Sequence, residues 1–507
     1  MIVSIGCQNK QLIEADLLIT GATVYDGQSV QPQNWQVAVT GDKIVYAGDG
    51  EQVNIEAEEI IDASGHILAP GFIDPHTHTT DDLNSEEANH NLPFLTQGVT
   101  TVVTGNDGRS PIPVGRAINQ WSQNGSGTNV VLLVGHGNVR RIVMGMEDRA
   151  PTEEEMDEMK SMVRQAMEDG AFGMSTGLYY TPGNYAETEE VIELAKIVSE
   201  FGGIYDTHQR DESSYNIGLL NSVREVIRIG AEAKLPVHIS HIKALGVDVW
   251  DKSTDVINLF DSARAVGIDI TANQYPYVAS GSGIGASTFP NWARAGGVEA
   301  MEARINDPEI GKQIRIEMAD NLRRRGGPAS LRITRSPEEA YIGKTLADLS
   351  EEWNLDPIEA AIKIILEGDA SVASFNMKES DIANFMRQEW CYTGSDGSSG
   401  HPRKYGTYTR KIRKYVLEDS VISMGHMINN STGKVAALLK LDKRGLIAPG
   451  YFADLVILNP STVKDRATFD EPEQISDGIA YVFVNGKLAV KDNEYQNVLA
   501  GKILKKQ

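Results

Sequence analysis

The feature that most constrains the fold of this chain is a repeated alternation of short apolar runs and longer amphipathic segments through its middle. Runs such as TTVVTG (100–105) have the length and β-branched content of buried strands, and the segments after several of them place apolar residues at helical spacing. Such alternation is typical of a parallel sheet. Eight candidate strands follow this pattern: HILAPGFID (66–74), TTVVTG, VVLLVG (130–135), AFGMSTG (171–177), GGIYDTH (202–208), LPVHISH (235–241), IDITANQY (268–275) and CYTGSD (391–396).

Eight strands in this order predict an α/β fold built on a TIM-like (β/α)8 barrel, with a doubly wound open sheet as the alternative. The segment 152–170 illustrates the helical half of the repeat. Threonine, here Thr152, is a preferred N-cap residue, acidic residues fill the first turn of the expected helix, and Gly170 follows its last turn. We expect the barrel to occupy residues 67–445.

Both ends of the chain have a different pattern, made of short β-branched strands separated by Gly and Asp. DLLITGATVYDG (16–27) represents the N-terminal end, and YVFVNGKLAV (481–490), with its Asn-Gly turn, represents the C-terminal end. We therefore expect one small β-sandwich domain assembled from residues 1–66 and 446–507.

One interval of the repeat is too long for a single helix. Between Thr288 and Trp390, a charged helical stretch is followed by a strand-like run. Long additions to barrel loops commonly shape active sites. We expect an inserted subdomain at about 289–350, near strand 7 of the barrel.

Charge and cysteine content limit the partners. The chain has 507 residues, with 47 Lys and Arg against 70 Asp and Glu, for a formal charge of −23. This balance argues against nucleic acid and anionic membranes as partners. The two cysteines, Cys7 and Cys391, cannot form a disulfide framework. No run is long enough for a membrane span, and the sequence does not indicate an oligomeric state.

The start of the chain, MIVSIGCQNKQ, leaves the location open. Its apolar run ending in Gly6-Cys7 is similar to the end of a bacterial lipoprotein signal that lacks its basic front. As the chain stands, we expect a cytoplasmic protein. A periplasmic or lipid-anchored protein, attached at Cys7, is the alternative if the true start lies upstream.

Metal-ligand residue types gather where the predicted strands end. His76 and His78 are two apart and therefore share one strand face. Imidazoles and carboxylates without cysteine suit Zn²⁺ and similar ions, and Asp396 can take a proton from a water and pass it to a leaving nitrogen. Because barrel chemistry lies at the carboxyl ends of the strands, these groups predict metal-dependent hydrolysis of an amide, ester or cyclic amide. The groups at strand ends are Asp74, His76, His78, Asp107, His208, Arg210, His238, His241, Lys243 and Asp396.

Several motifs, in order, resemble those of the amidohydrolase superfamily, and within it the N-acyl-D-amino-acid deacylases, or D-aminoacylases. The resemblance extends from about Leu17 to Val490. It implies a hydrolase that cleaves a small-molecule N-acyl-D-amino acid and uses one or two divalent metal ions. The expected metal is zinc, and other divalent ions are alternatives. The motifs are GFIDPHTH (71–78), GHGNVR (135–140), THQRDE (207–212), PVHISHIKALG (236–246), QYPYVASGSG (274–283), HPRKYGTYTR (401–410) and GLIAPGYFADLVIL (445–458).

The resemblance also implies individual roles. His76, His78, His208 and His241 match the metal histidines, and Asp396 matches the aspartate that moves the proton. Arg403 matches the arginine that binds the substrate α-carboxylate, which suits its two-pronged donor geometry. Tyr275 matches the tyrosine that assists, with Tyr277 as the alternative; Ser280 or Ser282 matches a hydroxyl contact. Lys243 is expected near the metal or substrate.

Asp107 departs from the family pattern, which has cysteine as a metal ligand within GNCG where this chain reads Gly105-Asn106-Asp107-Gly108. A carboxylate can replace the thiolate and can bridge two ions; alternatively, Asp107 turns away and binds only the loop. An all-nitrogen and oxygen site would tolerate manganese, cobalt or iron better than a thiolate site does.

Other functions remain as alternatives. A cyclic amidase of the dihydroorotase or hydantoinase type would need a carboxylated lysine from the fourth strand, but AFGMSTG has none. A dipeptidase acting on peptides with a C-terminal D-residue is a close variant of the deacylase. A catalytically silent relative would have lost metal ligands, and none is missing here.

Four further strand-end groups receive supporting roles. We expect Asp74 to support a metal histidine and His136 to make a structural hydrogen bond or contact the substrate. We expect His238 to face away from the barrel interior. Arg210, together with Asp211 and Glu212, is expected to form an ion network that holds its loop.

Overall fold

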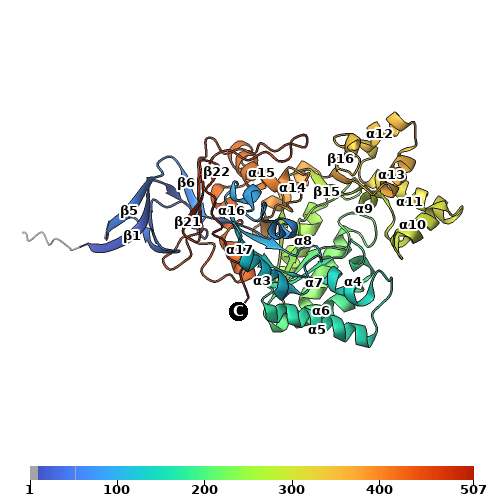
Figure 1. Ribbon diagram of the computed structural model, residues 1–507, viewed down its shortest axis with the longest axis horizontal. Coiled ribbons are helices and arrows are strands. Elements are labelled where there is room, and N and C mark those ends of the chain that lie inside the picture. The colour runs from blue at the N-terminus through green and yellow to red at the C-terminus, as the bar shows by residue number, and fades with distance from the viewer. Residues whose placement is uncertain (1–9, 52, 507) are drawn as a thin grey trace, which may run out of the picture.

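The computed structural model describes residues 10–51 and 53–506; Cys7 lies outside them. The molecule is elongated, with a β-rich unit at one end of its long axis and a helical unit at the other (Figure 1). The parallel strands lie between the two units. Among the helices that the structure describes, none is long and apolar enough to cross a membrane.

The middle of the molecule is an α/β unit in which every strand pairing is parallel. Leu133 alone separates β9 from β10, and the Phe172 N–H donates to the Leu132 carbonyl across this break at 2.9 Å. The strands run in the order β7 (Phe72–Asp74), β8 (Val99–Thr104), β9 (Asn129–Leu132) in one sheet and β10 (Val134–Gly135), β11 (Gly173–Gly177), β12 (Ile204–His208), β13 (Val237–Ile239), β14 (Ile270–Gln274), β18 (Cys391–Thr393) in the next.

Helices connect these strands and cover them with their apolar faces. The predicted helix at 152–170 is confirmed as α5 (Glu153–Asp169), in which the Thr152 side chain accepts from the Glu155 N–H and forms a capping box. Its buried residues include Met159, Val163 and Ala166, at the spacing of one helix face. The other helices are α1 (Thr80–Asn84), α2 (Leu92–Leu95), α3 (Val114–Asn124), α4 (His136–Met144), α6 (Thr188–Glu200), α7 (Leu219–Ala233), α8 (Ser253–Ala265), α14 (Glu379–Met386), α15 (Arg403–Arg410), the π-helix η5 (Lys411–Glu418), α16 (Met424–Asn429) and α17 (Gly433–Leu439).

The run HILAPGFID, predicted as one barrel strand, is two strands. β6 (Ile67–Pro70) pairs with β19 (Leu455–Leu458) of the β-rich unit, whereas β7 pairs with β8. Gly71 lies between them, and a larger residue would not fit there, since a Cβ would lie 2.2 Å from the Thr100 side chain. The chain therefore passes from one unit to the other four residues later than the predicted boundary at 66/67.

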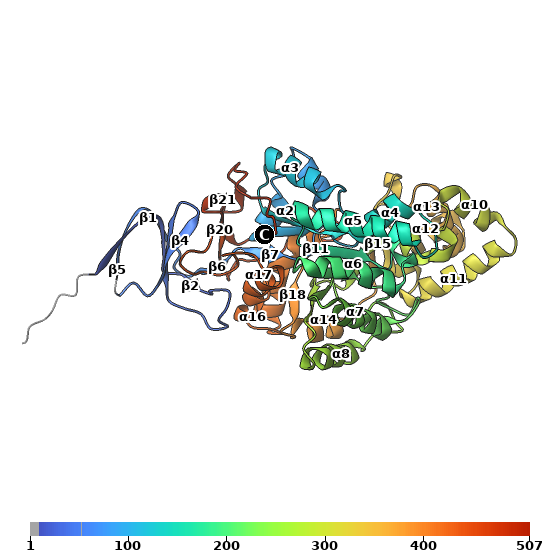
Figure 2. The same ribbon diagram turned by 90° about the horizontal axis from the view of Figure 1, so that it is seen from below.

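The β-rich unit combines strands from both ends of the chain (Figure 2). Val37 and Val39 of one sheet share a buried cluster with Leu455 and Ile457 of the other. One sheet has the order β4 (Lys43–Gly48), β3 (Gln36–Thr40), β1 (Gln11–Thr20), β5 (Val53–Asp62); the other has β2 (Thr23–Val24), β6, β19, β20 (Ile479–Val484), β21 (Lys487–Lys491), β22 (Glu494–Tyr495).

The last residues leave the β-rich unit and lie against the parallel strands. The Val130 N–H donates to the Lys502 carbonyl at 3.0 Å, and the Leu504 N–H donates to the Val130 carbonyl at 2.8 Å. The predicted second half of the β domain, 446–507, thus includes a final segment that packs elsewhere.

The long interval between β14 and β18 forms a unit with its own hydrophobic core, from Ile284 to Val372. This core extends beyond the expected insertion at 289–350 at both ends, because apolar residues on either side of that range pack into it. Its elements are the antiparallel strands β15 (Ala279–Gly283), β16 (Leu331–Arg335) and β17 (Ser371–Phe375) and the helices α9 (Ile284–Thr288), α10 (Val298–Asn306), α11 (Ile310–Arg324), α12 (Leu346–Trp353) and α13 (Pro357–Leu366).

Candidate metal centre

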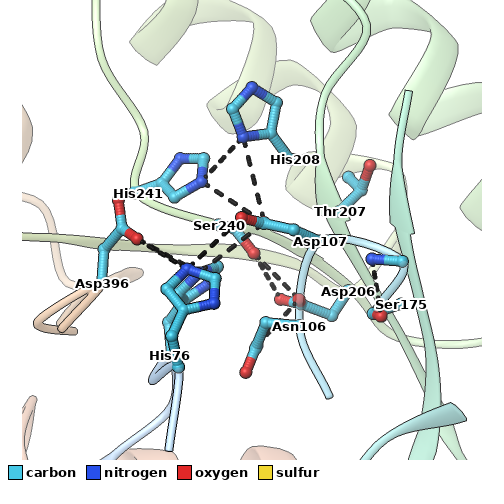
Figure 3. A network of polar contacts seen from close by, with 12 residues as sticks. His76, Asn106, Asp107, Ser175, Asp206, Thr207, His208, Ser240, His241 and Asp396 are labelled. Carbon is cyan, nitrogen blue, oxygen red and sulfur yellow. Dashed lines mark hydrogen bonds and ion pairs between the residues drawn. The ribbon is translucent and has the colours of Figure 1, made fainter. Parts of the chain in front are cut away.

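The predicted metal residues meet at the carboxyl ends of the parallel strands (Figure 3). Backbone contacts join the ends of the first and last of these strands. The Asp396 N–H donates to the His76 carbonyl at 2.9 Å, and Thr77 pairs with Gly397 in an isolated parallel β-bridge. The gathered side chains are His76 and His78 after β7, Asp107 after β8, His208 at the end of β12, His241 after β13 and Asp396 after β18.

Asp107 occupies the middle of this cluster (Figure 3). Its Oδ1 lies 3.6 Å from His76 Nε2, 3.5 Å from His241 Nε2 and 3.9 Å from His208 Nδ1. Its Oδ2 lies 3.6 Å from His78 Nε2. The carboxylate thus stands between two pairs of histidines, rather than turning away toward its own loop.

Three of these residues have backbone conformations that are rare for residues other than glycine. The φ angle is 55° at Asp107, 35° at His241 and 49° at Asp396. Aspartate tolerates the left-handed region better than most residues, but each instance still costs about 1–3 kcal/mol. The loops therefore hold these side chains at a cost in backbone strain, as functional sites commonly do.

Two close contacts complete the cluster. His208 Nδ1 and His241 Nε2 are 2.9 Å apart, and His78 Nε2 is 3.0 Å from Asp396 Oδ1. The other oxygen of Asp396 forms an ion pair of 2.7 Å with Arg403 Nη1. Asp396 therefore lies between the histidine cluster and a guanidinium.

The donor atoms fit a divalent ion. Both ring nitrogens of His76 and the Oδ1 of Asp107 are buried without a hydrogen-bond partner, although buried polar atoms are nearly always paired. The ligand atoms of His76, Asp107, His241 and Asp396 all lie within 4.8 Å of one another. Two neighbouring ligand atoms of a tetrahedral zinc ion lie roughly 3.3 Å apart. Asp107 Oδ1 lies 3.5–3.6 Å from the Nε2 atoms of His76 and His241, which is close to this distance.

The protonation states also suit ligation in most of the cluster. Burial lowers the pKa of His76, and lowers that of His208 to about 3, so both rings are neutral. Burial opposes ionisation of Asp107, but the neighbouring His76 and His241 hold the pKa of its carboxyl well below the usual range. Imidazole must be neutral and carboxylate ionised to bind a metal ion.

His241 is the exception, because its pKa is raised to about 9. Burial and Lys243 oppose this rise, and the carboxylates of Asp396, Glu212 and Asp107 cause it. An ion that binds His241 must displace this proton, so binding is coupled to proton release.

Glu212 belongs to this site, although the sequence suggested a loop-fixing ion network. Lys243 Nζ donates to Glu212 Oε1 at 2.6 Å, and the same oxygen lies 3.1 Å from His241 Nδ1. With His208 and His241, Glu212 forms a second group able to hold an ion. Its position four residues after His208, beyond a strand end, was the available signal.

The network expected around Arg210 has a different partner. Arg210 Nη2 donates to Glu225 Oε1 at 2.8 Å, and Asp211 accepts from backbone N–H groups of its own loop. Arg210 is thus structural, as predicted, but Glu212 does not belong to its network.

Asp206 underlies the cluster and connects two of its loops (Figure 3). Asn106 Nδ2 donates to its Oδ2 at 3.1 Å, and Ser240 Oγ lies 2.9 Å from both of its oxygens. Since these partners immediately precede Asp107 and His241, Asp206 positions both.

The residues expected to bind substrate line one cavity of about 840 Å³ together with the cluster. Arg403 lies over the Tyr275 ring, 4.7 Å from its centre, and Ser280 Oγ donates to the side-chain oxygen of Asn376 at 3.1 Å. Lys243, Tyr275, Ser280, Ser282 and Arg403 all line the cavity.

The alternative tyrosine, Tyr277, lies outside this arrangement. Its hydroxyl donates to the Pro402 carbonyl at 3.4 Å, and its ring packs edge-on against His401. Of the two tyrosines, Tyr275 is the one that faces the cavity.

Two supporting residues behave as expected and one does not. Asp74 Oδ1 accepts from the N–H groups of His76 and Ser395, and His136 Nε2 lies 2.7 Å from Glu190 Oε1. His238 was predicted to face away from the interior, and this is wrong. Asn273 Nδ2 lies 2.9 Å from His238 Nε2, while Asn273 Oδ1 accepts from the His241 N–H.

Comparison with known proteins identifies similar chains. The model of the amidohydrolase family matches residues 59–490. A D-aminoacylase from Alcaligenes xylosoxydans xylosoxydans is 31% identical, over 96% of this chain and 97% of the relative. An N-acyl-D-glutamate deacylase from the same organism is 32% identical, over 93% of each chain.

A solved structure also matches along nearly the whole length. It is an N-acyl-D-glutamate deacylase from Bordetella bronchiseptica, complexed with zinc and a phosphonate inhibitor that mimics the tetrahedral intermediate of the reaction. The two structures share 30% sequence identity with a TM-score of 0.82, and the match covers 97% of this chain and all of the other.

Proposed function

The chain belongs to the amidohydrolase family, and from that premise we propose that it hydrolyses N-acyl-D-amino acids to a carboxylate and a free D-amino acid. The observation that carries the proposal is the cluster of four histidines and Asp107, with Asp396 joining it to Arg403. Relatives that act on D-amino-acid derivatives, matched over nearly the full length, support the substrate class. The handedness rests on those relatives alone.

We infer that the parallel strands close into a (β/α)8 barrel. The contact between Phe172 and Leu132 joins the two sheets on one side, and the link from Asp396 to His76 joins them on the other. This supports three units: a β-sandwich formed from 1–66 and 446–507 with the exceptions described above, the barrel at 67–445, and the insertion within it.

The metal would be held by His76, His78, Asp107, His208 and His241. Their nitrogen and oxygen donors suit zinc, with manganese, cobalt or iron as substitutes, and the position of Asp107 between the histidine pairs supports one or two ions. A divalent ion supplies Lewis acidity, which lowers the pKa of water and polarises a carbonyl.

Asp396 is proposed as the group that moves the proton. Its carboxyl has a pKa below the usual range, because Arg403 and His241 outweigh the opposing effect of burial. It is therefore ionised and can accept a proton from the attacking water. The same carboxyl can then donate that proton to the departing amine nitrogen.

Arg403 and Tyr275 are proposed to bind the substrate α-carboxylate. The guanidinium is buried in the cavity wall, and Tyr275 has a buried hydroxyl with no partner. A carboxylate between them would accept from Arg403 Nε and from the Tyr275 hydroxyl, which are buried without a hydrogen-bond partner. Ser280 adds a hydroxyl to this wall, and Lys243 holds Glu212 and His241 in position.

A cyclic amidase is less well supported. The strand that would carry the required lysine is β11, which reads GMSTG. Asp107 instead takes the central position among the histidines.

Amine release from paired N-acetyl-D- and N-acetyl-L-amino acids by the zinc-loaded protein tests this function, with hydrolysis of dihydroorotate, hydantoin and dipeptides that end in a D-residue measured alongside. We expect turnover of D-compounds only. Ring opening of dihydroorotate or hydantoin without any D-compound being cleaved would overturn the proposal in favour of a cyclic amidase, and cleavage confined to peptides with a C-terminal D-residue would make the protein a dipeptidase.

A further inference from the structure

A buried guanidinium without a carboxylate partner lines the active cavity at some distance from the histidine cluster. Arg325 is 2% exposed and follows helix α11 of the inserted unit. Its Nε donates to the Ser287 carbonyl at 3.2 Å, and its Nη1 donates to Ser374 Oγ at 3.3 Å. These acceptors are neutral, and no carboxylate of the described residues lies within ion-pair distance of it.

Most other buried cations of the described chain do have a carboxylate. Arg140 pairs with Glu190, Lys243 with Glu212 and Arg444 with Asp454. Lys411 is an exception, but burial lowers its pKa to about 8, so it can lose its charge. Arginine cannot be deprotonated in proteins, so Arg325 keeps its charge in this buried position.

An unpaired buried charge is unfavourable unless something compensates for it. The neighbouring tyrosines indicate where the compensation would come from. The Tyr215 hydroxyl is buried without a partner, and its ring centre lies 5.7 Å from the Arg325 guanidinium carbon. Arg325 Nη2 also approaches the Tyr179 hydroxyl at 3.5 Å. All three side chains line the cavity.

Tyr179 connects this point to the reacting centre. Its ring is stacked on His208 at 5.7 Å between centres, so a single tyrosine separates Arg325 from a metal histidine. A substrate held at the cluster therefore has only a short distance to span before one of its branches reaches Arg325.

The rest of this wall has the same sign of charge. Arg294 and Arg335 line the cavity from the inserted unit and likewise lack an ion-pair partner in the described part of the chain. The acidic residue on this side, Asp369, accepts from the N–H groups of Gly285 and Ala370. The wall is therefore positively charged within a chain whose net charge is −23.

We propose that Arg325, with Tyr179 and Tyr215, binds a second carboxylate of the substrate, so that dianionic N-acyl-D-amino acids are preferred. This inference rests on the proposed deacylase function. Arg403 would take the α-carboxylate and Arg325 the additional one. That additional carboxylate could stand on the amino-acid side chain, as in D-glutamate, or on the acyl group, as in a succinyl amide.

The first experiment compares substrates that differ in charge, among them N-acetyl-D-glutamate and N-acetyl-D-glutamine, which have nearly the same shape. The zinc-loaded wild-type protein is assayed with N-acetyl-D-glutamate, N-acetyl-D-glutamine, N-succinyl-D-glutamine and N-acetyl-D-methionine. We expect one of the two dianions to have a kcat/KM about tenfold to hundredfold above that of N-acetyl-D-glutamine, as a charge-assisted hydrogen bond provides. Which dianion is favoured identifies the branch that carries the second carboxylate.

The remaining outcomes of this experiment separate the two proposals. If N-acetyl-D-glutamine or N-acetyl-D-methionine equals or exceeds both dianions, the Arg325 inference is overturned while the deacylase function stands. If none of the four compounds is cleaved, the proposed function itself fails, and the inference fails with it.

Variants assign the preference to Arg325. Arg325→Met should lower kcat/KM for the favoured dianion about tenfold to hundredfold and leave N-acetyl-D-glutamine nearly unchanged. Arg323→Met is the control from the same helix, because Arg323 lies outside the cavity and already pairs with Asp248 and Asp320; it should change neither rate. Equal losses on both substrates in Arg325→Met would indicate a structural role and contradict the proposal.

A second variant covers the case in which Arg325→Met does not fold. Tyr215→Phe removes only the buried, unpaired hydroxyl. It should reduce the ratio of the dianion rate to the glutamine rate several-fold without lowering the glutamine rate. An unchanged ratio would contradict the role assigned to Tyr215. If the wild-type rates also do not depend on the charge of the substrate, the whole proposal is overturned.

Discussion

At the scale of single residues, Asp107 connects the two histidine pairs of the cluster. One of its oxygens faces His76 and His241, and the other faces His78. A single carboxylate so placed can hold two ions together or complete the coordination of one. The number of ions bound by the chain should therefore depend on this residue more than on any single histidine.

Asp107→Asn should reduce the zinc bound per chain and lower kcat at least tenfold, because an amide oxygen is a neutral and weaker ligand. Asp107→Cys should retain zinc but bind manganese less well, since thiolate favours softer ions. Elemental analysis after dialysis against each metal measures both effects. Unchanged zinc content in Asp107→Asn would show that Asp107 is not a ligand.

Glu212 is the second residue with a specific consequence. It accepts from Lys243 and lies 3.1 Å from His241 Nδ1. Glu212→Gln should weaken zinc affinity about tenfold to hundredfold, as loss of a group that orients a metal histidine does. The measurement is zinc competition with a chelator.

Glu225→Gln provides the matched control for Glu212→Gln, because Glu225 pairs with Arg210 outside the cluster. It should alter stability without altering zinc affinity. Equal effects of the two variants on zinc affinity would place Glu212 outside the site.

The strand-end residues were predictable because the carboxyl ends of neighbouring parallel strands meet at one face of the fold. This reasoning located the four histidines, Asp107 and Asp396 from their positions after strand-like runs. It missed Glu212 and Arg325, because their importance lies in contacts across loops rather than in spacing along the chain. It misplaced His238, because the chain turns sharply at His241, where φ is 35°, so that simple strand alternation does not continue from one to the other.

At the scale of elements, the strand β18 is supported by a lysine buried in an unusual helix. Lys411 begins the π-helix η5, is fully buried, and donates to Thr393 Oγ1 of β18 at 2.9 Å. Burial lowers its pKa from 10.5 to about 8. The folded state therefore binds this proton less tightly than the unfolded chain does.

The sign of the resulting pH effect follows from linkage. Below about pH 8 the lysine is charged in both states, and the full cost of burying the charge, roughly 3 kcal/mol, destabilises the fold. Between about pH 8 and about pH 10.5 the folded protein has lost the proton while the unfolded chain still holds it, and the cost falls steadily as pH rises. Above about pH 10.5 the lysine is neutral in both states and the cost is gone. Lys411→Met should be more stable than wild type at pH 7, with the difference shrinking toward pH 10.5; urea unfolding at several pH values measures it. A pH-independent difference would contradict the assignment.

Element boundaries were harder to predict than the elements themselves. Helix α5 follows from Thr152 and its apolar spacing, since both are local properties. The division of HILAPGFID at Gly71 depends on the strands with which its two halves pair, β19 and β8, which are separate segments of the chain. The limits of the inserted unit depend in the same way on which core its end strands join.

At the scale of the whole molecule, a buried polar network joins the β-rich unit to the parallel strands. Asn129 at the start of β9 donates to Asp454 Oδ2 at 3.1 Å, and Asp454 also pairs with Arg444. Asn485, in the turn between β20 and β21, donates to Asn129 Oδ1 at 2.9 Å. Residues distant in sequence thus make one fully buried connection, which neither end of the chain could form alone.

Asp454→Asn should destabilise the protein by about 3 kcal/mol or more, because it leaves Arg444 buried without a carboxylate. We also expect the β-rich unit to unfold before the parallel strands, so that calorimetry shows two separate transitions. Asp465→Asn, which removes a half-buried partner of Arg410, is the control and should have a smaller effect. A single transition at the wild-type temperature would argue against this network as the connection.

The most direct test of the central claim is a kinetic comparison of Asp396→Asn with wild type on an N-acetyl-D-amino acid, with zinc per chain measured on the same samples. Asp396 is assigned to proton transfer, so kcat should fall at least hundredfold, while the fold and most of the bound zinc are retained. A variant that keeps both its zinc and a kcat within about threefold of wild type would contradict the mechanism, and with it the assignment of this cluster as the catalytic site.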